Sequence, residues 1–514
     1  MSETEKPAGA YAWYALGVLV LVYMLNFIDR QILSILANDI KADLGLRDDQ
    51  LGFLYGTAFA IFYALFGVPL GRLADGSNRV RLLTIGLGLW SFMTALSGFA
   101  RNAATLAFAR IGVGVGEATA TPCAYSLIAD WFPARIRGTA LGIYSAGLFV
   151  GSGLSLLIGG AIVKAWNGAY PHGGPLGLVG WQAAFVGVGL PGLILAVWVS
   201  TLREPLRGAI DGIPSEGDAH PWRVFGGQLV QLIPPLTLID ATRRGGRALA
   251  VNLAGGAAIG ALAFTCARAT GNAPQFIFLG IGFYAVFSWA CALRAHDRPT
   301  FALTWGSPAF MGIVLAYAAD CFVGYAVSYW AAPYAERIFA VDKATLGFLI
   351  GAPAALGGFL GAIFGGRLAD MLQARFAGGR IMVIAIALVC PVPIMLVGYS
   401  TANPTLFYVL AFAVQLVTST ALGASGAASQ ALVLPRMRGV ATGIFFLGTA
   451  LIGLGLGPFV AGFVSEASGS LATGVKATLL IEPLGLIAMI VAIRAAPKAA
   501  ATLLDRARAA GEPV

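Results

Sequence analysis

The chain has 514 residues, of which 58% are hydrophobic and only 11% are charged, and its mean hydropathy is +0.80. This composition excludes an ordinary soluble domain, in which about a quarter of the residues are charged. The net charge of +9 does not indicate nucleic-acid binding either, because the bases are spread over many loops and form no single patch with aromatic residues between them. The five cysteines form no CxxC pair and the three histidines lie apart, so we expect no disulfide framework, no metal site and no cofactor.

Fourteen hydrophobic segments are long enough to cross a bilayer, whose hydrocarbon core is roughly 30 Å thick. They occupy residues 12–37, 51–74, 80–100, 104–130, 138–163, 180–201, 247–267, 275–293, 308–331, 345–369, 380–400, 404–431, 438–463 and 476–496. Alternate loops between them collect the Lys and Arg residues, and such loops face the cytoplasm. We therefore expect an all-α, multi-pass protein of the plasma (inner) membrane with both termini in the cytoplasm.

The first segment contains an acid and a base, Asp29 and Arg30, at a depth from which they cannot both reach water. A charge within the hydrocarbon costs roughly 3 kcal/mol or more, so it usually faces a bundle interior or an aqueous cavity. Asn26 lies one helical turn before the pair and Ser34 one turn after Arg30, so the polar side chains share one face. A self-neutralised pair that only helps helices to pack is the structural alternative. We favour a functional role, because intramembrane ionisable residues are functional by default.

The chain also contains an internal repeat. The sequence Gly-Arg-Leu-Ala-Asp follows the second segment at 71–75 and recurs without change at 366–370, and the stretch 135–144 recurs in related form at 436–445. Each copy follows the second segment of a half or precedes the fifth, so the chain reads as a duplicated six-segment unit. We predict an amino-terminal six-helix bundle over 1–201 and a carboxy-terminal one over 308–514. A connecting region, 202–307, holds an extra hairpin made by 247–267 and 275–293, which we place at the periphery.

The fourth segment carries Arg110 and Glu117, which are seven residues apart and so lie on one helical face, two turns from each other. By helical rise, Arg110 falls at the depth of Asp29 and Arg30, and Glu117 lies two turns deeper. An acid in such a site can bind a proton, and Arg recognises carboxylate or phosphate through its forked donors. Salt bridges of Asp29 with Arg110, or of Arg30 with Glu117, that only hold the helices together are the structural alternative.

Several of these stretches resemble a known family. Gly71-Arg-Leu-Ala-Asp75-Gly-Ser-Asn-Arg79-Val-Arg81 resembles the signature loop of the major facilitator superfamily, and the stretch 110–118 is similar to its fourth-span motif. Within the superfamily, Asn26-Phe-Ile-Asp-Arg, the Gly-Val-Gly-Glu-Ala stretch and Ala-Asp-Trp-Phe-Pro at 129–133 most resemble Spinster transporters. The resemblance implies a major facilitator fold: two six-helix bundles related by a pseudo-two-fold axis, here with a two-helix insert between them.

The resemblance also implies a gate at the cytoplasmic ends of the spans. There the signature acid, Asp75, lies against a helix amino terminus of the opposite half, where a carboxylate is stabilised by roughly 0.3–1 kcal/mol. Asp130 could pair with Arg72 or Arg137, and such a cluster would break when the cavity opens inward. Alternatively, these bases only anchor cytoplasmic loops. The expected gate residues are Gly71, Arg72, Asp75, Arg79, Asp130, Arg137 and Asp370.

Three functional classes follow from these observations. The resemblance implies a proton-coupled secondary transporter that moves an anionic amphipathic lipid of the sphingolipid or lysolipid type by alternating access. A carrier of a small organic anion or drug is the alternative. A membrane-embedded lipid-modifying enzyme is disfavoured, because the sequence shows no His-Asp pair, metal cluster or nucleophile motif. We expect a monomer that contacts membrane lipids.

For the transporter, we assign roles to the ionisable residues of the spans. We expect Asp29 and Glu117 to carry the proton. The residues expected to bind the substrate are Arg30, Arg110, Asn26, Asp320 and Tyr325, of which the last two come from the carboxy-terminal half.

Overall fold

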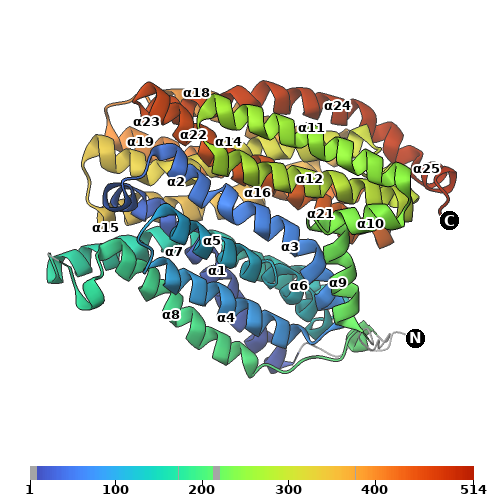
Figure 1. The fold of residues 1–514 in the computed structure, drawn as a ribbon, viewed down its shortest axis with the longest axis horizontal. Coiled ribbons are helices and arrows are strands. Elements are labelled where there is room, and N and C mark those ends of the chain that lie inside the picture. The colour runs from blue at the N-terminus through green and yellow to red at the C-terminus, as the bar shows by residue number, and fades with distance from the viewer. Residues whose placement is uncertain (1–8, 172, 212–219, 377, 514) are drawn as a thin grey trace. The chain divides into compact units, whose positions relative to one another are not determined.

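The computed structural model describes residues 9–171, 173–211, 220–376 and 378–513. These residues are nearly all helical, with no strand among them (Figure 1). Within this described part, thirteen helical stretches are long and apolar enough to cross a membrane. They are α1 (Ala10–Leu44), α2 with α3 (Asp48–Tyr55, Thr57–Gly76), α4 (Arg79–Ser97), α7 (Ala134–Ala169), α8 (Gly180–Ser200), α11 (Gly246–Thr270), α12 (Ala273–His296), α14 (Pro308–Phe339), α15 with η3 and α16 (Lys343–Leu346, Gly347–Gly351, Ala352–Arg375), α17 with α18 (Gly379–Val389, Pro391–Gly398), α19 with α20 (Pro404–Thr418, Ala421–Gln430), η4 with α21, η5 and α22 (Pro435–Met437, Arg438–Gly448, Thr449–Leu454, Gly455–Ser468), and α23 with η6 and α24 (Leu471–Ala477, Thr478–Ile481, Glu482–Ala501). The expected all-α membrane architecture is confirmed.

The fourth expected segment, 104–130, is not among these thirteen stretches. It consists of α5 (Ala103–Glu117) and α6 (Ala120–Trp131), and the break follows directly after Glu117. The Thr119 hydroxyl donates a hydrogen bond of 2.8 Å to the Gly116 carbonyl. A side chain that bonds to the backbone in this way competes with the helical ladder. The break therefore places an ionisable side chain at a helix end inside the membrane.

The connecting region contains a second, sharper break. α9 (Pro221–Leu232) and α10 (Thr237–Arg243) meet at an angle of 91°. Pro234 and Pro235 lie at the bend and supply no N–H for a continuous helix. The remaining short helices are η1 (Pro175–Gly177), η2 (Ala209–Asp211), α13 (Arg298–Leu303) and α25 (Leu503–Ala509).

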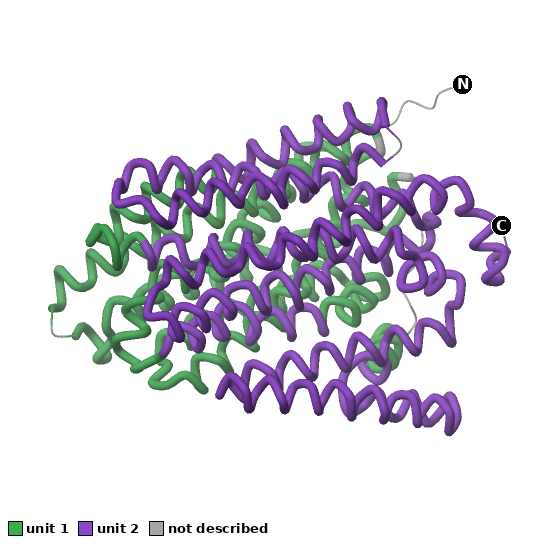
Figure 2. The backbone as a smooth tube through the Cα atoms, turned by 90° about the horizontal axis from the view of Figure 1, so that it is seen from above, with its two compact units in different colours: residues 1–46, 66–228, 335–355 green, residues 47–65, 229–334, 356–514 purple. Residues whose placement is uncertain are grey.

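The helices pack as two compact units, which Figure 2 shows in different colours. Unit 1 comprises residues 1–46, 66–228 and 335–355. Within it, α1 lies along α7 so closely that a Cβ at Gly151 would be 2.3 Å from the Met24 carbonyl oxygen. A Cβ at Gly160 of α7 would be equally close to the Lys343 carbonyl oxygen. Glycine is needed at both positions because only backbone without a side chain can approach so closely.

Unit 2 comprises residues 47–65, 229–334 and 356–514. Here α2 packs against α22, and α11 and α12 form the expected hairpin. Ser288 donates a hydrogen bond of 2.6 Å to the side chain of Asn252, which joins the two hairpin helices. Only 6% of the most apolar part of α11 is buried, so this helix lies at the surface of its unit. The division into 1–201, 202–307 and 308–514 describes the duplication and not these packing units, and it stays a prediction.

The contact between α2 and α22 gives a first prediction. A Cβ at Gly52 would lie 2.5 Å from the Pro458 carbonyl oxygen and 2.7 Å from the Phe459 Cα, both backbone atoms that cannot rotate away. We expect Gly52→Ala to lower the free energy of unfolding by about 1–3 kcal/mol, the usual cost of overpacking. Thermal unfolding of the purified protein in detergent measures this. Gly67→Ala in α3 is the control, because no atom lies within 4 Å of its added Cβ; equal losses in the two variants would contradict the packing argument.

Candidate functional site

A buried ion pair joins α1 to α5 within unit 1. The Arg30 guanidinium donates a hydrogen bond of 2.8 Å from Nη2 to Oε2 of Glu117. Both residues are buried, with 6% and 1% of their surfaces exposed. Arg30 also lies 4.7 Å from the centre of the Phe27 ring, and Asn26 is a polar neighbour of the Glu117 carboxylate. The pair gives each charge an opposite partner at membrane depth, where a lone buried charge is strongly destabilising.

The second acid and the second base of this site are arranged differently. Arg110 of α5 donates from Nη1 to the backbone carbonyl of Asp29 at 3.2 Å. Neither carboxylate oxygen of Asp29 has a hydrogen-bond partner of normal geometry among the described residues. Arg110 and Glu117 act on this carboxylate through their charges, and Thr94 and Trp90 of α4 are its polar neighbours. Asp29 is therefore a fully buried acid that has a cation nearby but no direct salt bridge.

The backbone around the site is fixed by close helix contacts. Ser155 of α7 donates a hydrogen bond of 2.7 Å to the Ile28 carbonyl, next to Asp29. A Cβ at Gly116 would lie 2.8 Å from the Gly86 carbonyl oxygen of α4. These contacts hold α1 and α5 at fixed distances from α7 and α4, so the charged side chains meet at defined positions.

The sequence placed these four residues together, and unit 1 contains them as one cluster. Of the two salt bridges considered, Arg30 with Glu117 forms as an ion pair, whereas Arg110 contacts the backbone oxygen of Asp29. Glu117 was expected two turns below the other three. It nevertheless lies within hydrogen-bond distance of Arg30, because the long Arg30 side chain reaches it.

The expected residues of the carboxy-terminal half belong to unit 2. Asp320 lies buried in α14, and its Oδ1 has no hydrogen-bond partner in the described part of the chain. Glu482, at the start of α24, is the acid whose charge acts on it. Tyr325 lies half-buried one and a half turns further along α14. The substrate-binding role of both Asp320 and Tyr325 stays a prediction.

A second cluster in unit 1 surrounds Arg79, which is fully buried. Its guanidinium forms ion pairs with Asp130 and, at 2.7 Å, with Glu204. It also donates to the Ser126 hydroxyl at 2.8 Å and to the Pro205 carbonyl at 3.0 Å. The structure thus gives Asp130 a partner, Arg79, that the sequence analysis did not name.

Glu204 and Arg207 are members of this cluster that the sequence analysis missed. Arg207 donates to the Ala74 carbonyl at 2.7 Å, and its charge acts on Asp75, as do those of Arg72 and Arg79. Burial and the neighbouring charge of Arg79 lower the pKa of Arg207. The repeat offers a signal for Glu204, because an acid stands 301 residues later as well, in Asp505.

The second copy of the signature loop lacks such a cluster. Asp370 pairs with Arg380 at 3.1 Å, but 75% and 34% of these side chains are exposed. Ala427 and Ala431 stand 301 residues after Ser126 and Asp130, so two partners of the buried arginine have no polar counterpart. Identical loop sequences therefore lie in different surroundings.

The other expected gate residues lie near the first cluster in the sequence. A Cβ at Gly71 would meet the Pro122 ring at 3.9 Å, so glycine allows α3 and α6 to approach here. Arg72 is exposed, and Arg137 donates to the Phe132 carbonyl at 3.2 Å. Their role in gating stays a prediction.

A third charged cluster lies at the other end of α1 and was not expected. Lys343, only 8% exposed, forms ion pairs with Glu336 and, at 3.4 Å, with Asp39. Asn38 donates to Glu336 at 2.7 Å and accepts from Arg337 at 2.8 Å. All five residues belong to unit 1. The cluster joins α1 to the end of α14 and to α15.

The described residues contain no group of three His, Cys, Asp or Glu side chains placed to hold a metal ion. The five cysteines are free thiols.

Comparisons with known proteins agree with this geometry. The profile of the Major Facilitator Superfamily matches residues 19–318. An MFS-type efflux pump of Mycolicibacterium smegmatis is 27% identical over 504 residues, which cover 97% of this chain and 95% of the relative. A relative from Escherichia coli named "Probable L-galactonate transporter" is 30% identical over 191 residues, 37% of this chain and 39% of the relative.

Among solved structures, the fold matches a bacterial homologue of the human lysosomal transporter Spinster in an inward-facing and unoccupied conformation. The TM-score is 0.68 at 26% identity, and the match covers 97% of this chain and 98% of that one. The expected major facilitator fold and the likeness to Spinster transporters are thereby confirmed.

The unequal surroundings of the two signature loops give a second prediction. We expect Arg79→Gln to destabilise the protein by roughly 3–5 kcal/mol, because removing one partner of a buried pair leaves uncompensated charge. Arg380→Gln, the matched change in the second copy, breaks an exposed pair worth about 0–1 kcal/mol. Thermal unfolding in detergent compares the two variants. Similar losses of stability in the two variants would show that the burial of Arg79 does not decide how much it contributes to the stability of the protein.

Proposed function

We propose that this chain, which belongs to the Major Facilitator Superfamily, is a proton-coupled transporter of an organic anion that works by alternating access. Members of this superfamily are transporters and not enzymes, and the apolar helices make this chain a multi-pass membrane protein. The observation that carries the proposal is the buried cluster of Asp29, Arg30, Arg110 and Glu117.

The balance of charge in this cluster supports coupling between a proton and an anion. Two carboxylates and two guanidinium groups cancel when all four are ionised. Arg30 and Glu117 already neutralise each other, so Asp29 is the counter-charge of Arg110 within the cluster. A proton on Asp29 would leave the four residues with a net charge of about +1, which an anionic substrate can neutralise. One proton and one anionic group would then bind together at little net electrostatic cost.

Glu117 adds a second step to this scheme. An anion that competes for Arg30 would release the Glu117 carboxylate, and a buried carboxylate without its cation favours the protonated form. In this proposal Asp29 and Glu117 share the proton, Arg30 and Arg110 hold the anionic group, and Asn26 orients the Glu117 carboxylate. Asp320 and Tyr325 would contact the remainder of the substrate.

The substrate that we propose is an anionic amphipathic lipid of the sphingolipid or lysolipid type. The support is the likeness over nearly the whole chain to a bacterial homologue of Spinster. A small organic anion is the second candidate, because the Escherichia coli relative that matches 37% of this chain is named "Probable L-galactonate transporter". Both candidates carry an anionic group, which the guanidinium groups of Arg110 and Arg30 would bind in this proposal.

Alternating access requires contacts that form on one side of the membrane and break on the other. We propose that the Arg79 cluster contributes to the gate at the cytoplasmic side, together with Gly71, Arg72, Asp75, Arg137 and Asp370. The Lys343 cluster would close the opposite side, since it joins helices of the two sequence halves within unit 1. Both termini would then face the cytoplasm.

Transport by purified protein in proteoliposomes tests the role of the acids. We expect Asp29→Asn or Glu117→Gln to abolish uptake driven by a pH gradient, because the proton is shared between the two acids and each variant removes one of them. Exchange of substrate for substrate survives, since it moves no net proton. A lysophospholipid and L-galactonate, each measured with and without the gradient, separate the two substrate classes.

Arg110→Ala and Asp342→Asn complete this test. Loss of the Arg110 cation favours the protonated acid, so the pH midpoint of the inward–outward equilibrium should move upward. Distances between spin labels measure this midpoint.

Asp342 is the control acid, because a hydrogen bond from Thr345 and the neighbouring Lys164 lower its pKa to about 2. Its ionised form is lost only as the pH falls toward that value, so Asp342→Asn should leave the number of protons moved per substrate unchanged. If the midpoint is unchanged in both acid variants, the cluster is structural and coupling must be sought at Asp320.

The gate gives a further prediction. We expect Asp75→Asn to shift the equilibrium toward inward-open states more than Asp370→Asn does. Asp75 lies among the charges of Arg72, Arg79 and Arg207, whereas Asp370 is 75% exposed. Distances between spin labels on the cytoplasmic ends of the two halves measure the shift, and equal shifts would refute the asymmetry.

A further inference from the structure

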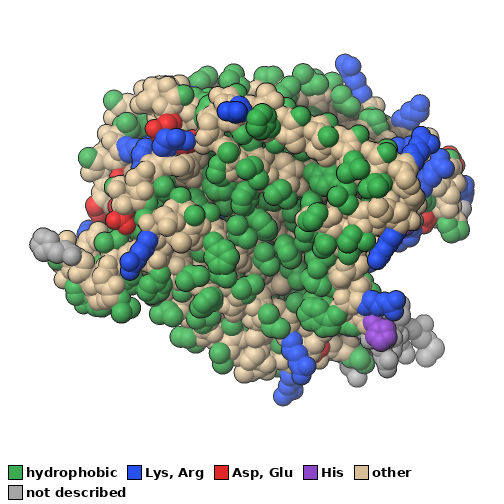
Figure 3. Space-filling model, in the orientation of Figure 1, with side chains coloured by type: hydrophobic (Ala, Val, Ile, Leu, Met, Phe, Trp, Pro, Cys, Tyr) green, Lys and Arg blue, Asp and Glu red, His purple; other side chains and the backbone are tan. Residues whose placement is uncertain are grey.

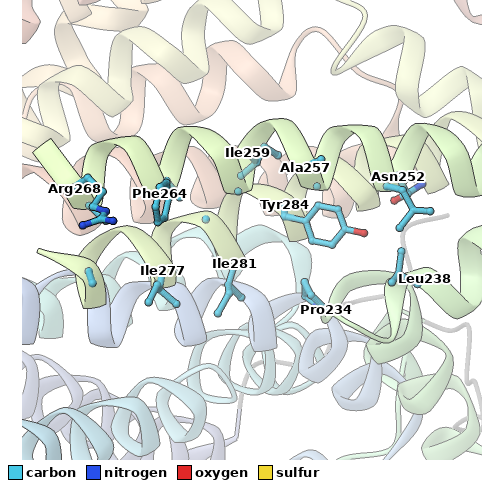
Figure 4. A pocket seen from close by; sticks show the side chains of 17 residues that line it. Pro234, Leu238, Asn252, Ala257, Ile259, Phe264, Arg268, Ile277, Ile281 and Tyr284 are labelled. Atoms are coloured by element: carbon cyan, nitrogen blue, oxygen red, sulfur yellow. The ribbon is translucent and has the colours of Figure 1, made fainter.

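A long groove follows the seam between α11 and α12 of the hairpin (Figure 4). Its volume is about 620 Å³. Its lining is almost wholly apolar and includes Ile259, Phe264, Ile277 and Ile281. Arg268 lies at one end, and Pro234 and Leu238 lie at the other, near Asn252 (Figure 4).

The groove exists because α11 presents very small residues along the seam. Gly256, Ala257, Gly260 and Ala263 line it from α11. A Cβ at Gly256 would meet the Tyr284 ring at 3.1 Å, but no atom lies within 4 Å of a Cβ at Gly260. The helices therefore touch near Tyr284 and leave open space beside Gly260.

The groove faces the bilayer and not water. Large apolar side chains that line it stand exposed, including Phe264 at 63% and Ile277 at 55%. Figure 3 shows hydrophobic side chains over this part of the surface. α11 carries Arg247 near its start and Arg268 near its end, which a helix places about 32 Å apart. That separation matches a hydrocarbon core of roughly 30 Å, so each guanidinium lies at the level of a lipid headgroup.

The dimensions decide what can occupy the groove. Between Asn252 and Arg268 the helix rises about 24 Å, and the volume of about 620 Å³ is spread along this length. A long apolar groove with one guanidinium at its end matches an extended acyl chain joined to a charged headgroup.

We propose that this groove binds one anionic glycerophospholipid of the surrounding bilayer. An acyl chain lies along the Gly and Ala residues of α11, and the phosphate contacts Arg268 at the headgroup level. The Arg268 guanidinium packs at 5.4 Å over the Phe264 ring, which directs it to the mouth of the groove. No acid occurs in α11, so the charge at this end is complementary to a phosphate. The site belongs to the hairpin and is independent of the proposed transport function.

Native mass spectrometry of the full-length protein in detergent tests this site. The probes are palmitoyl-oleoyl phosphatidylglycerol and the zwitterionic phosphatidylcholine with the same chains. We expect the wild type to retain one phosphatidylglycerol. Gly260→Leu fills the groove without a clash and should lower retention at least tenfold. Arg268→Gln should weaken phosphatidylglycerol binding about fivefold, the effect of one base at the membrane surface, and phosphatidylcholine binding less.

Ala261→Leu is the matched control, because Ala261 is an exposed residue of the same helix that does not line the groove. It should retain lipid as the wild type does. Equal retention in Gly260→Leu and Ala261→Leu would overturn the proposal. So would a dimer that disappears in Gly260→Leu while lipid binding is unchanged, since the groove would then hold a second copy. Ala257→Leu, a second groove-filling change, gives the same comparison if Gly260→Leu does not fold.

Discussion

The high cost of an unpaired charge in a hydrocarbon environment governs the arrangement of unit 1. Asp29 and Arg30 are adjacent in α1 and cannot both leave the membrane, so α5 must supply partners at the same depth. Glu117 meets Arg30 at 2.8 Å, and Arg110 meets the Asp29 carbonyl at 3.2 Å. Glycines in α4, α5 and α7 then allow the backbones to come close enough for these contacts.

The two signature loops show that identical residues can form different electrostatic contacts when their surroundings differ. Arg79 is enclosed by Asp130, Glu204 and Ser126, whereas Arg380 has an exposed pair with Asp370. The duplication therefore preserved a loop sequence but not an electrostatic network. Removing one partner from a buried network leaves uncompensated charge, whereas removing one partner of an exposed pair costs little. Identical loop residues therefore need not contribute equally to stability.

The extra hairpin obeys a different constraint from the helices around the charged site. α11 carries no buried charge and exposes most of its apolar surface, so its neighbours must be largely lipid. Its link to α12 is the hydrogen bond between Ser288 and Asn252 together with close contacts at small residues. Small residues that permit close packing on one side also leave the open groove beside Gly260 on the other.

The sequence by itself determined the membrane class, the helical spans, the duplication and the four ionisable residues of the site. Each of these follows from composition or from local spacing: apolar length, positive loops, repeated motifs and charges at membrane depth. Breaks within spans did not follow from the sequence, since the structure divides the second span at Gly56 and the fourth between Glu117 and Ala120. In the fourth span the Thr119 hydroxyl bonds to the Gly116 carbonyl, a side-chain contact that hydropathy does not report.

Only the tertiary structure decided the partners. Arg79 pairs with residues 51 and 125 positions away, and Lys343 reaches Asp39 across the two halves of the sequence. Spacing along a helix fixes which face a side chain occupies, but not which helix lies opposite. That depends on close approaches of backbones at glycines such as Gly116 and Gly151, and these are set by the packing of the whole unit.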